Sequence, residues 1–142
     1  MSDKILYIDD SESVGLMSIA DGYSVDDAVV SLPPDCRYAI FSEEEIVNTE
    51  YFDDFFAALT INFSGTPTID FDIIKARDIT KNRLRRERIS LFEKNDILLR
   101  DAIVEGDQEK INIATRERDR LRDITLLVDQ INDLGDLLSI HP

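Results

Sequence analysis

The stretch that decides the fold runs from residue 70 to residue 125 and reads DFDIIKARDITKNRLRRERISLFEKNDILLRDAIVEGDQEKINIATRERDRLRDIT. Residues 71–104 contain neither proline nor glycine, the two residue types that most often interrupt a helix. Their apolar residues recur along one helical stripe that charged residues interrupt: Phe71, Ile74, Ile79, Leu84, Ile89, Phe92, Leu99 and Ile103. A helix of this length is roughly 50 Å long, because each residue adds about 1.5 Å.

A second helix is predicted to follow a sharp turn at Glu105-Gly106-Asp107. Gly106 suits the left-handed conformation that ends many helices, and Asp107 is a good N-cap for the next helix. The apolar stripe of that helix carries Ile111, Ala114, Arg118, Leu121 and Ile124. Residues 70–125 are therefore expected to form an antiparallel helical hairpin.

The end of the second helix, Leu121-Arg122-Asp123-Ile124-Thr125, is predicted to be structural. Leu121 and Ile124 have the spacing to pack on the first helix, and Arg122 and Asp123 are expected to bond to neighbouring helices or to the tail. The residues expected to define the hairpin are Gly106, Asp107, Leu121, Arg122, Asp123 and Ile124.

Residues 1–69 are predicted to form a separate head. Residues 4–8 and 13–19 have the composition of two strands of a hairpin, and residues 38–41 of a third strand that pairs with both. Ser24 followed by Asp27 indicates the start of a short helix. Residues 60–63 and 68–71 are expected to pair across the turn at Gly65-Thr66-Pro67. The fold class predicted for the chain is α+β, with a small antiparallel sheet in the head.

Residues 51–59 hold four aromatic side chains within six positions: Tyr51, Phe52, Phe55 and Phe56. Their spacing covers most of the surface of a helix. Two interpretations stay open, a buried plug for the small sheet and a contact surface for a partner. The tail, residues 126–142, is expected to place a short helix, capped by Asp133, back on the hairpin, because its leucines would otherwise be exposed.

The charge of the chain is concentrated in its first half. The net charge is −14; residues 1–70 hold two basic residues against fifteen acidic ones, whereas residues 71–142 hold fourteen against fifteen. Such a head repels phosphate backbones and anionic lipids. No apolar run approaches the length of a membrane span. We therefore expect neither nucleic acid nor a membrane as partner.

One basic run, residues 81–88, stands against this charge and contains Lys81, Arg83, Arg85, Arg86 and Arg88. No aromatic residue is interleaved among the basic ones, and a helix directs the arginines to several faces. We expect Arg83, Arg85, Arg86 and Arg88 to serve protein contacts, either with acidic residues of the same fold or with a partner surface. A homo-oligomer formed through the hairpin is one such arrangement.

Residue counts exclude several kinds of catalytic site. His141 is the only histidine and Cys36 the only cysteine, so one chain cannot build a Ser-His-Asp triad or a Cys-His zinc site. The five glycines are scattered singly and form no phosphate-binding loop. Asp9 and Asp10, with either Asp21 or Asp26-Asp27, could gather a hard cation, but their spacing matches no EF-hand. The prediction is a non-enzymatic protein without catalytic residues, cofactor or metal.

Several motifs along the chain resemble those of tail-fibre assembly and tail assembly chaperone-like proteins of tailed bacteriophages. The residues that carry this resemblance are Asp21-Gly22, Pro34-Asp35, Tyr38, Asp72, Lys75-Ala76-Arg77, Ile79, Arg85, Arg88, Arg100-Asp101-Ala102, Glu105-Gly106-Asp107 and Leu121-Arg122-Asp123-Ile124-Thr125. The resemblance implies a structural or assembly role. The expected partner is a tail-fibre, tail-tip or baseplate protein.

The resemblance also implies a location, the host cytoplasm during assembly, with the virion tail as the alternative. The absence of a recognisable signal peptide and the single cysteine agree with a reducing cytoplasm.

The strong negative charge of the head, −13 for residues 1–70, leaves one rival hypothesis for the function open. In it the chain is an acidic mimic of DNA that inhibits a host nucleic-acid-binding enzyme.

Overall fold

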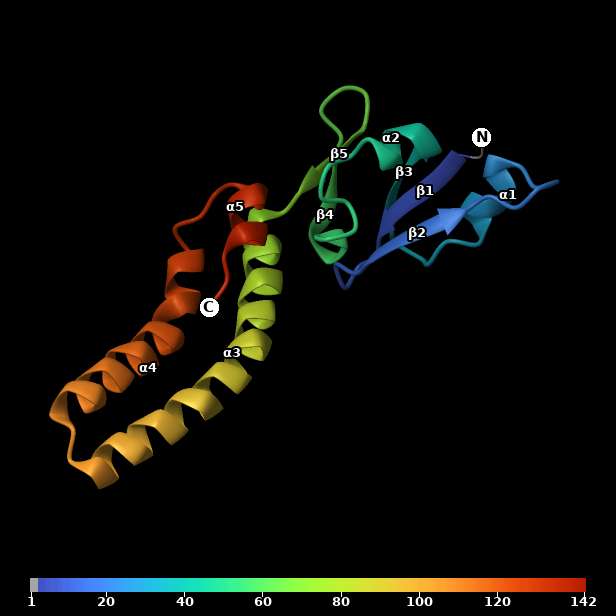
Figure 1. Ribbon diagram of the computed structural model, residues 1–142. Helices are drawn as coiled ribbons and strands as arrows, with labels where there is room; N and C mark the ends of the chain where they lie inside the picture. Colours follow the sequence, from blue (N-terminus) through green and yellow to red (C-terminus); the bar gives the residue numbers. More distant parts are fainter. Residues whose placement is uncertain (1–2) are drawn as a thin grey trace. The chain divides into compact units, whose positions relative to one another are not determined.

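The computed structural model describes residues 3–142 and is shown in Figure 1. It is α+β, with antiparallel sheets in the N-terminal half followed by two long helices and one short helix, which confirms the predicted fold class. Two compact units divide the chain between Ala76 and Arg77. The first turn of the long helix thus belongs with the expected head, residues 1–69, and the expected tail, residues 126–142, belongs with the hairpin. Residues 1 and 2 of that head lie outside the described part.

The larger sheet contains β1 (Asp3–Ile8), β2 (Val14–Ser18) and β3 (Arg37–Ser42), all antiparallel, in the order β2-β1-β3. The predicted hairpin of the first two strands is confirmed. The prediction that the third strand pairs with both was wrong, since β3 pairs only with β1. β1 takes the centre because Ile5, Leu6 and Ile8 are all buried and need cover on both sides of the strand.

Two short helices flank β3, and each begins with a capping box. α1 (Val25–Val30) is capped by Ser24 and Asp27, and α2 (Glu43–Val47) by Ser42 and Glu45. In each box the serine hydroxyl accepts from the third helical N–H while the acidic side chain accepts from the serine N–H. These local bonds explain how helices of one and a half turns form at all.

The aromatic segment does not form the expected helix over residues 51–59. It is a series of turns ending in a short 3₁₀ helix (Phe56–Ala58), and Tyr51 has a φ of 63°. A regular helix would spread the four rings around its surface, whereas the turns bury both Phe52 and Phe55. The second sheet follows: β4 (Leu59–Asn62) pairs antiparallel with β5 (Thr68–Phe71), as predicted.

The core of this N-terminal unit lies on one face of the β1–β3 sheet and extends to the β4–β5 pair. Alternating residues of β1 and β3 point into it, as the two-residue repeat of a strand requires. Its buried members are Leu6, Ile8, Ala39, Phe41, Ile46, Phe52, Leu59 and Ile61. The core therefore uses the aromatic segment as the plug that one of the two interpretations predicted.

The hairpin is built from α3 (Ile73–Glu105) and α4 (Gln108–Val128). Asp72 caps α3 by accepting from the N–H of Ile74 at 3.0 Å. Gly106 has a φ of 71°, and Asp107 accepts from the N–H of Lys110 at 3.2 Å, so both predicted turn residues have the predicted roles. α4 continues three residues beyond the expected end because Val128 is buried on the same face as Ile124.

The tail forms α5 (Leu134–Ser139) after a short connection from α4. Asp133 caps it by accepting from the N–H of Asp136 at 3.1 Å. Leu137 is completely buried, so the helix is held on the hairpin by an apolar contact, as predicted from its leucines. Figure 1 shows α5 and the start of α3 side by side.

Candidate functional site

Arg83 and Arg88, two of the four predicted contact arginines, bond within the fold. Arg83 donates through Nη2 to the carbonyls of Leu137 (3.0 Å) and Ile140 (2.8 Å), and through Nη1 to Glu87 (3.1 Å). It therefore satisfies carbonyls that the end of α5 leaves free. The sequence left two alternatives open for these arginines, contacts within the fold and contacts with a partner surface. Arg83 makes contacts within the fold.

Arg88 makes the corresponding contact with α4. Its Nη1 donates to the carbonyls of Leu121 at 3.1 Å and Arg122 at 3.0 Å, and its guanidinium lies 5.6 Å from the centre of the Phe92 ring. Arg77, which was not among the predicted contact residues, donates to the carbonyl of Ile131 at 3.0 Å. α3 thus holds the returning chain through arginine side chains that reach its backbone.

Arg85 and Arg86, the other two arginines, are exposed. Arg85 donates to Asn82 at 3.0 Å on the same helix. Lys81, at the start of the basic run, pairs with Asp129 at 2.6 Å. The structure therefore does not bring the four arginines together into one patch, because the helix turns Arg83 and Arg88 toward α4 and α5.

The aromatic residues predicted as a partner surface lie mainly in the core. Phe52 is 8% exposed and Phe55 is 2% exposed, and Tyr51 and Phe56 are half-buried. Phe52 packs edge-on against Phe56 with ring centres 5.7 Å apart, and Tyr51 packs likewise against Phe55 at 6.4 Å. Phe52 and Phe55 are therefore corrected from candidate interface residues to core residues.

The predicted structural segment of α4 is confirmed in part. Leu121 and Ile124 are buried and face α3. The side chains of Arg122 and Asp123 do not reach another helix, because they pair with each other at 2.9 Å, and Arg122 also pairs with Asp119 at 3.1 Å. Arg122 does bond to the other helix of the hairpin, but through its backbone carbonyl, which accepts from Arg88 at 3.0 Å.

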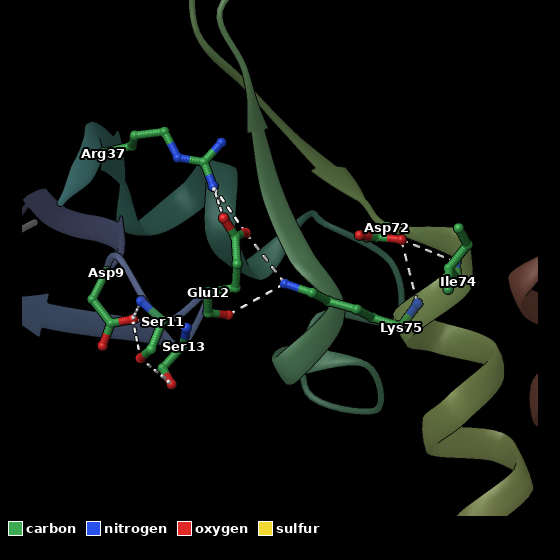
Figure 2. Close-up of polar contacts among 8 residues, drawn as sticks. All are labelled: Asp9, Ser11, Glu12, Ser13, Arg37, Asp72, Ile74 and Lys75. Atoms are coloured by element: carbon green, nitrogen blue, oxygen red, sulfur yellow. Dashed lines mark hydrogen bonds and ion pairs between the residues drawn. The ribbon is translucent and has the colours of Figure 1, made fainter.

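Of the carboxylates considered for a cation, Asp9 and Asp10 lie on the loop between β1 and β2, whereas Asp21 follows β2 and Asp26 and Asp27 belong to α1. Figure 2 shows the contacts of Asp9. Asp9 accepts from the Ser11 hydroxyl at 2.7 Å and from the N–H of Ser13 at 2.9 Å, and these bonds lower the pKa of Asp9. Glu12 pairs with Arg37 at 3.0 Å and Lys75 at 3.5 Å. Among residues 3–142 no group of three or more His, Cys, Asp or Glu is placed to hold a metal.

A groove opens between α3 and α4 near the turn of the hairpin. It has a volume of about 790 Å³ and is lined by Asn95, Leu98, Lys110, Ile113, Ala114, Arg116, Glu117 and Arg120. Leu98 is 64% exposed and Ile113 is 55% exposed, although they lie beside buried positions on their helices. We call residues 93–120 the tip of the hairpin and residues 77–92 with 121–128 its base.

The groove exists because the facing positions of the tip carry small or polar side chains. Asn95 is buried and donates to the carbonyl of Ala114 at 2.8 Å, and Ala102 is the other buried residue that α3 contributes to the tip. Neither an alanine nor an asparagine fills the space that leucines fill in the base. A second, smaller hollow of about 390 Å³ lies between the same helices, and Phe92, Asp96 and Arg118 are among the residues that line it.

The edges of the groove are charged. Lys110 pairs with Glu105 at 3.1 Å, and that hydrogen bond raises the pKa of Lys110. Arg120 pairs with Glu117 at 2.6 Å, and its hydrogen bond lowers the pKa of Glu117. Arg116 bonds only to the carbonyl of Asn112 at 3.3 Å among the contacts described for residues 3–142, so its charge is not neutralised by a carboxylate.

The sequence prediction did not identify this groove. The residues that could have revealed it are Asn95 and Ala114, because a polar and a small residue on the facing stripes weaken the packing there. Leu98 and Ile113 lie on the apolar side of their helices, and a pattern of residues does not show whether such positions meet a partner within the chain.

No family model, curated protein or solved structure matches the chain. Among residues 3–142, no helix combines the length and the apolar character that crossing a membrane requires. The groove of the hairpin is the candidate functional site because it combines a concave shape with exposed apolar side chains.

Proposed function

We propose that this protein is a non-enzymatic tail protein of a tailed bacteriophage that docks onto a tail-fibre or tail-tip protein through its helical hairpin. It acts as an assembly factor in the host cytoplasm or stays in the virion tail as a minor component. The observation that carries the docking role is the groove of the tip, with Leu98 and Ile113 more than half exposed. The phage setting comes from the sequence motifs that resemble tail-fibre assembly proteins.

An empty groove leaves its apolar side chains in contact with water, which costs free energy. Apolar side chains in a concave site gain more from a partner than the same side chains on a convex surface, because a partner can surround them and exclude water. The groove lies between two helices of 33 and 21 residues, which gives it rigid walls. A rigid, preformed site loses little conformational entropy when a partner binds.

The test is to express the chain together with candidate tail-fibre and tail-tip proteins of the phage that encodes it, and to purify the complex through a tag on the chain. We expect the complex to survive a rise from about 0.1 M to about 1 M salt, because an apolar interface is not screened. Ile113→Ser should abolish copurification. Ile103→Ser, which changes an equally exposed isoleucine outside the groove lining, should preserve it.

A different result would favour the acidic DNA mimic. In that case the chain would copurify with a nucleic-acid-binding enzyme and would release it steeply as salt rises, with no effect of Ile113→Ser. Mass spectrometry of purified virions with copy-number estimation separates the two forms of the proposal. A virion component is present at a fixed copy number, whereas an assembly factor is absent from mature particles.

A further inference from the structure

We infer that the groove of the tip receives one amphipathic α-helix of a partner protein, about three turns long, whose apolar stripe is flanked by carboxylates. This inference rests on the proposed docking role of the hairpin and adds the class of structure that docks.

The length of the groove fits a helix. On α4 the lining runs from Lys110 to Arg120 and includes Ile113, Ala114, Arg116 and Glu117. This part of α4 spans about 15 Å, the length of about three turns of a helix. A third helix laid between two others packs its ridges into such a groove and is anchored by apolar residues three and four positions apart. Leu98 and Ile113 supply the apolar contact for those anchors.

The charges of the groove favour an acidic partner. Lys110, Arg116 and Arg120 stand on its edges. Lys110 is paired with Glu105 and Arg120 with Glu117, so Arg116 is the edge cation whose charge no carboxylate neutralises among the contacts described for residues 3–142. The whole chain, in contrast, has a net charge of −14. A local basic edge on an acidic protein attracts carboxylates specifically, because the rest of the surface repels them.

The same charges disfavour a second copy of this chain as occupant. Two hairpins stacked groove to groove would bring Lys110, Arg116 and Arg120 of one copy near the same residues of the other. Like charges brought together at an interface oppose association. Charge complementarity therefore points to a partner whose docking helix carries acidic residues beside its apolar stripe.

The test uses the full chain and a fluorescein-labelled helical peptide of about 18 residues, followed by fluorescence anisotropy. The peptide carries leucines at helical intervals and glutamates on both flanks. A matched peptide has lysine in place of every glutamate. We expect the glutamate peptide to bind at least about tenfold more tightly than the lysine peptide at low salt.

Two pairs of variants locate the binding. Ile113→Ser should weaken binding of the glutamate peptide at least about tenfold. Ile103→Ser should leave it unchanged, since Ile103 lies five residues from Leu98, about 140° round the helix. Replacing both Arg116 and Arg120 with Gln should remove the preference for glutamate.

The control for that charge pair replaces Arg85 and Arg86, which are exposed in the base, with Gln. This double variant should keep the preference for the glutamate peptide. Circular dichroism of each variant checks that the helices are intact, which is expected because Ile113 is 55% exposed.

Three results would overturn the inference: equal affinity for the two peptides, equal damage by Ile103→Ser and Ile113→Ser, or dimerisation of the chain that Ile113→Ser disrupts in sedimentation. The last result would identify a second copy as the occupant. Failure of the docking proposal is distinguishable. If the chain binds the glutamate peptide but copurifies with no tail protein, only the proposed function is rejected. If Ile113→Ser still copurifies with a tail protein and the chain binds no peptide, only the groove is rejected as the docking site.

Discussion

The base and the tip of the hairpin belong to the same two helices but are held together differently. In the base, the positions where the helices face each other carry large, almost completely buried side chains, namely Leu84, Leu121, Ile124 and Val128, with Leu137 of α5. Ile89, Leu126 and Leu127 of the base are more than half exposed. In the tip, Leu98 and Ile113 remain more than half exposed, and the buried residues are Asn95, Ala102 and Ala114. Close pairing of two helices needs a continuous stripe of large apolar side chains on both, and an interruption of that stripe leaves a groove.

Polar contacts follow the same division. In the base, Arg83 and Arg88 each donate to at least two backbone carbonyls of the returning chain. In the tip, Asn95 makes a single such bond, to Ala114. A charged donor to a carbonyl contributes more than a neutral one. The base therefore has both the apolar and the polar part of the stabilisation, and the tip has less of each.

The sharpest test of this comparison is Leu121→Ala in the base against Ile113→Ala in the tip. Leu121 is completely buried, so its truncation should lower the free energy of unfolding by about 2 to 4 kcal/mol. Ile113 is exposed, and its truncation should cost less than about 1 kcal/mol. Urea denaturation followed by circular dichroism measures both. Equal losses would show that base and tip are packed alike.

The polar part of the base is tested by Arg83→Gln. The variant loses the bonds to the carbonyls of Leu137 and Ile140 and the contact with Glu87, and should lose about 1.5 to 3 kcal/mol of unfolding free energy. Limited proteolysis should then cut near α5 before it cuts elsewhere. Arg85→Gln removes an exposed arginine two positions away and should change stability by less than about 0.5 kcal/mol. An intact α5 in Arg83→Gln would contradict the capping role.

Much of the fold could be predicted from the sequence because its signals are local. Ser24, Asp107 and Asp133 each cap the helix that follows them, and Gly106 takes the left-handed conformation of the turn. Capping depends only on residues within one turn, so a pattern identifies it. The aromatic segment was mispredicted because its rings follow the shape of the sheet core, which is a non-local constraint.

The candidate site was much less predictable. The basic run suggested one contact surface, but whether Arg83 meets Leu137 depends on how the chain returns over a separation of 54 residues. The groove is a property of two facing helices and follows from Asn95 and Ala114 being opposite each other. Periodicity assigns a residue to a face of its own helix and says nothing of what the partner helix presents there.

A smaller effect is expected when the tip is made to resemble the base. Asn95→Leu removes the bond to the carbonyl of Ala114, which remains within the helical backbone ladder, and buries more apolar surface. The free energy of unfolding should rise by about 1 kcal/mol, the difference between the apolar gain and the lost hydrogen bond. Asn95→Ala, which removes the bond without adding volume, should lower it. Chemical denaturation of the two variants gives the sign, and destabilisation by both would show that the asparagine is needed in the tip.

The smallest expected effect concerns Glu87 in the base, which accepts from Arg83 and lies 3.3 Å from His141 Nδ1. Partial burial raises the pKa of Glu87, but hydrogen bonds from Arg83 and then His141 outweigh it and hold the pKa below the ordinary 4.5. A carboxylate whose pKa is lower in the folded state than in the unfolded state stabilises the fold at pH values above the unfolded pKa. It loses that contribution as the pH falls through the folded pKa.

The Glu87 side chain is 35% exposed, so solvent screening limits its contribution to the free energy of unfolding to less than about 1 kcal/mol. The difference in unfolding free energy between the parent and Glu87→Gln should therefore be present at about pH 7 and should shrink as the pH falls below 4.5. Glu93→Gln, an exposed change on the same helix, should show no such dependence. A difference for Glu87→Gln that grows on acidification would mean that Glu87 destabilises the base when ionised, which would remove it from the set of polar contacts that separate base from tip.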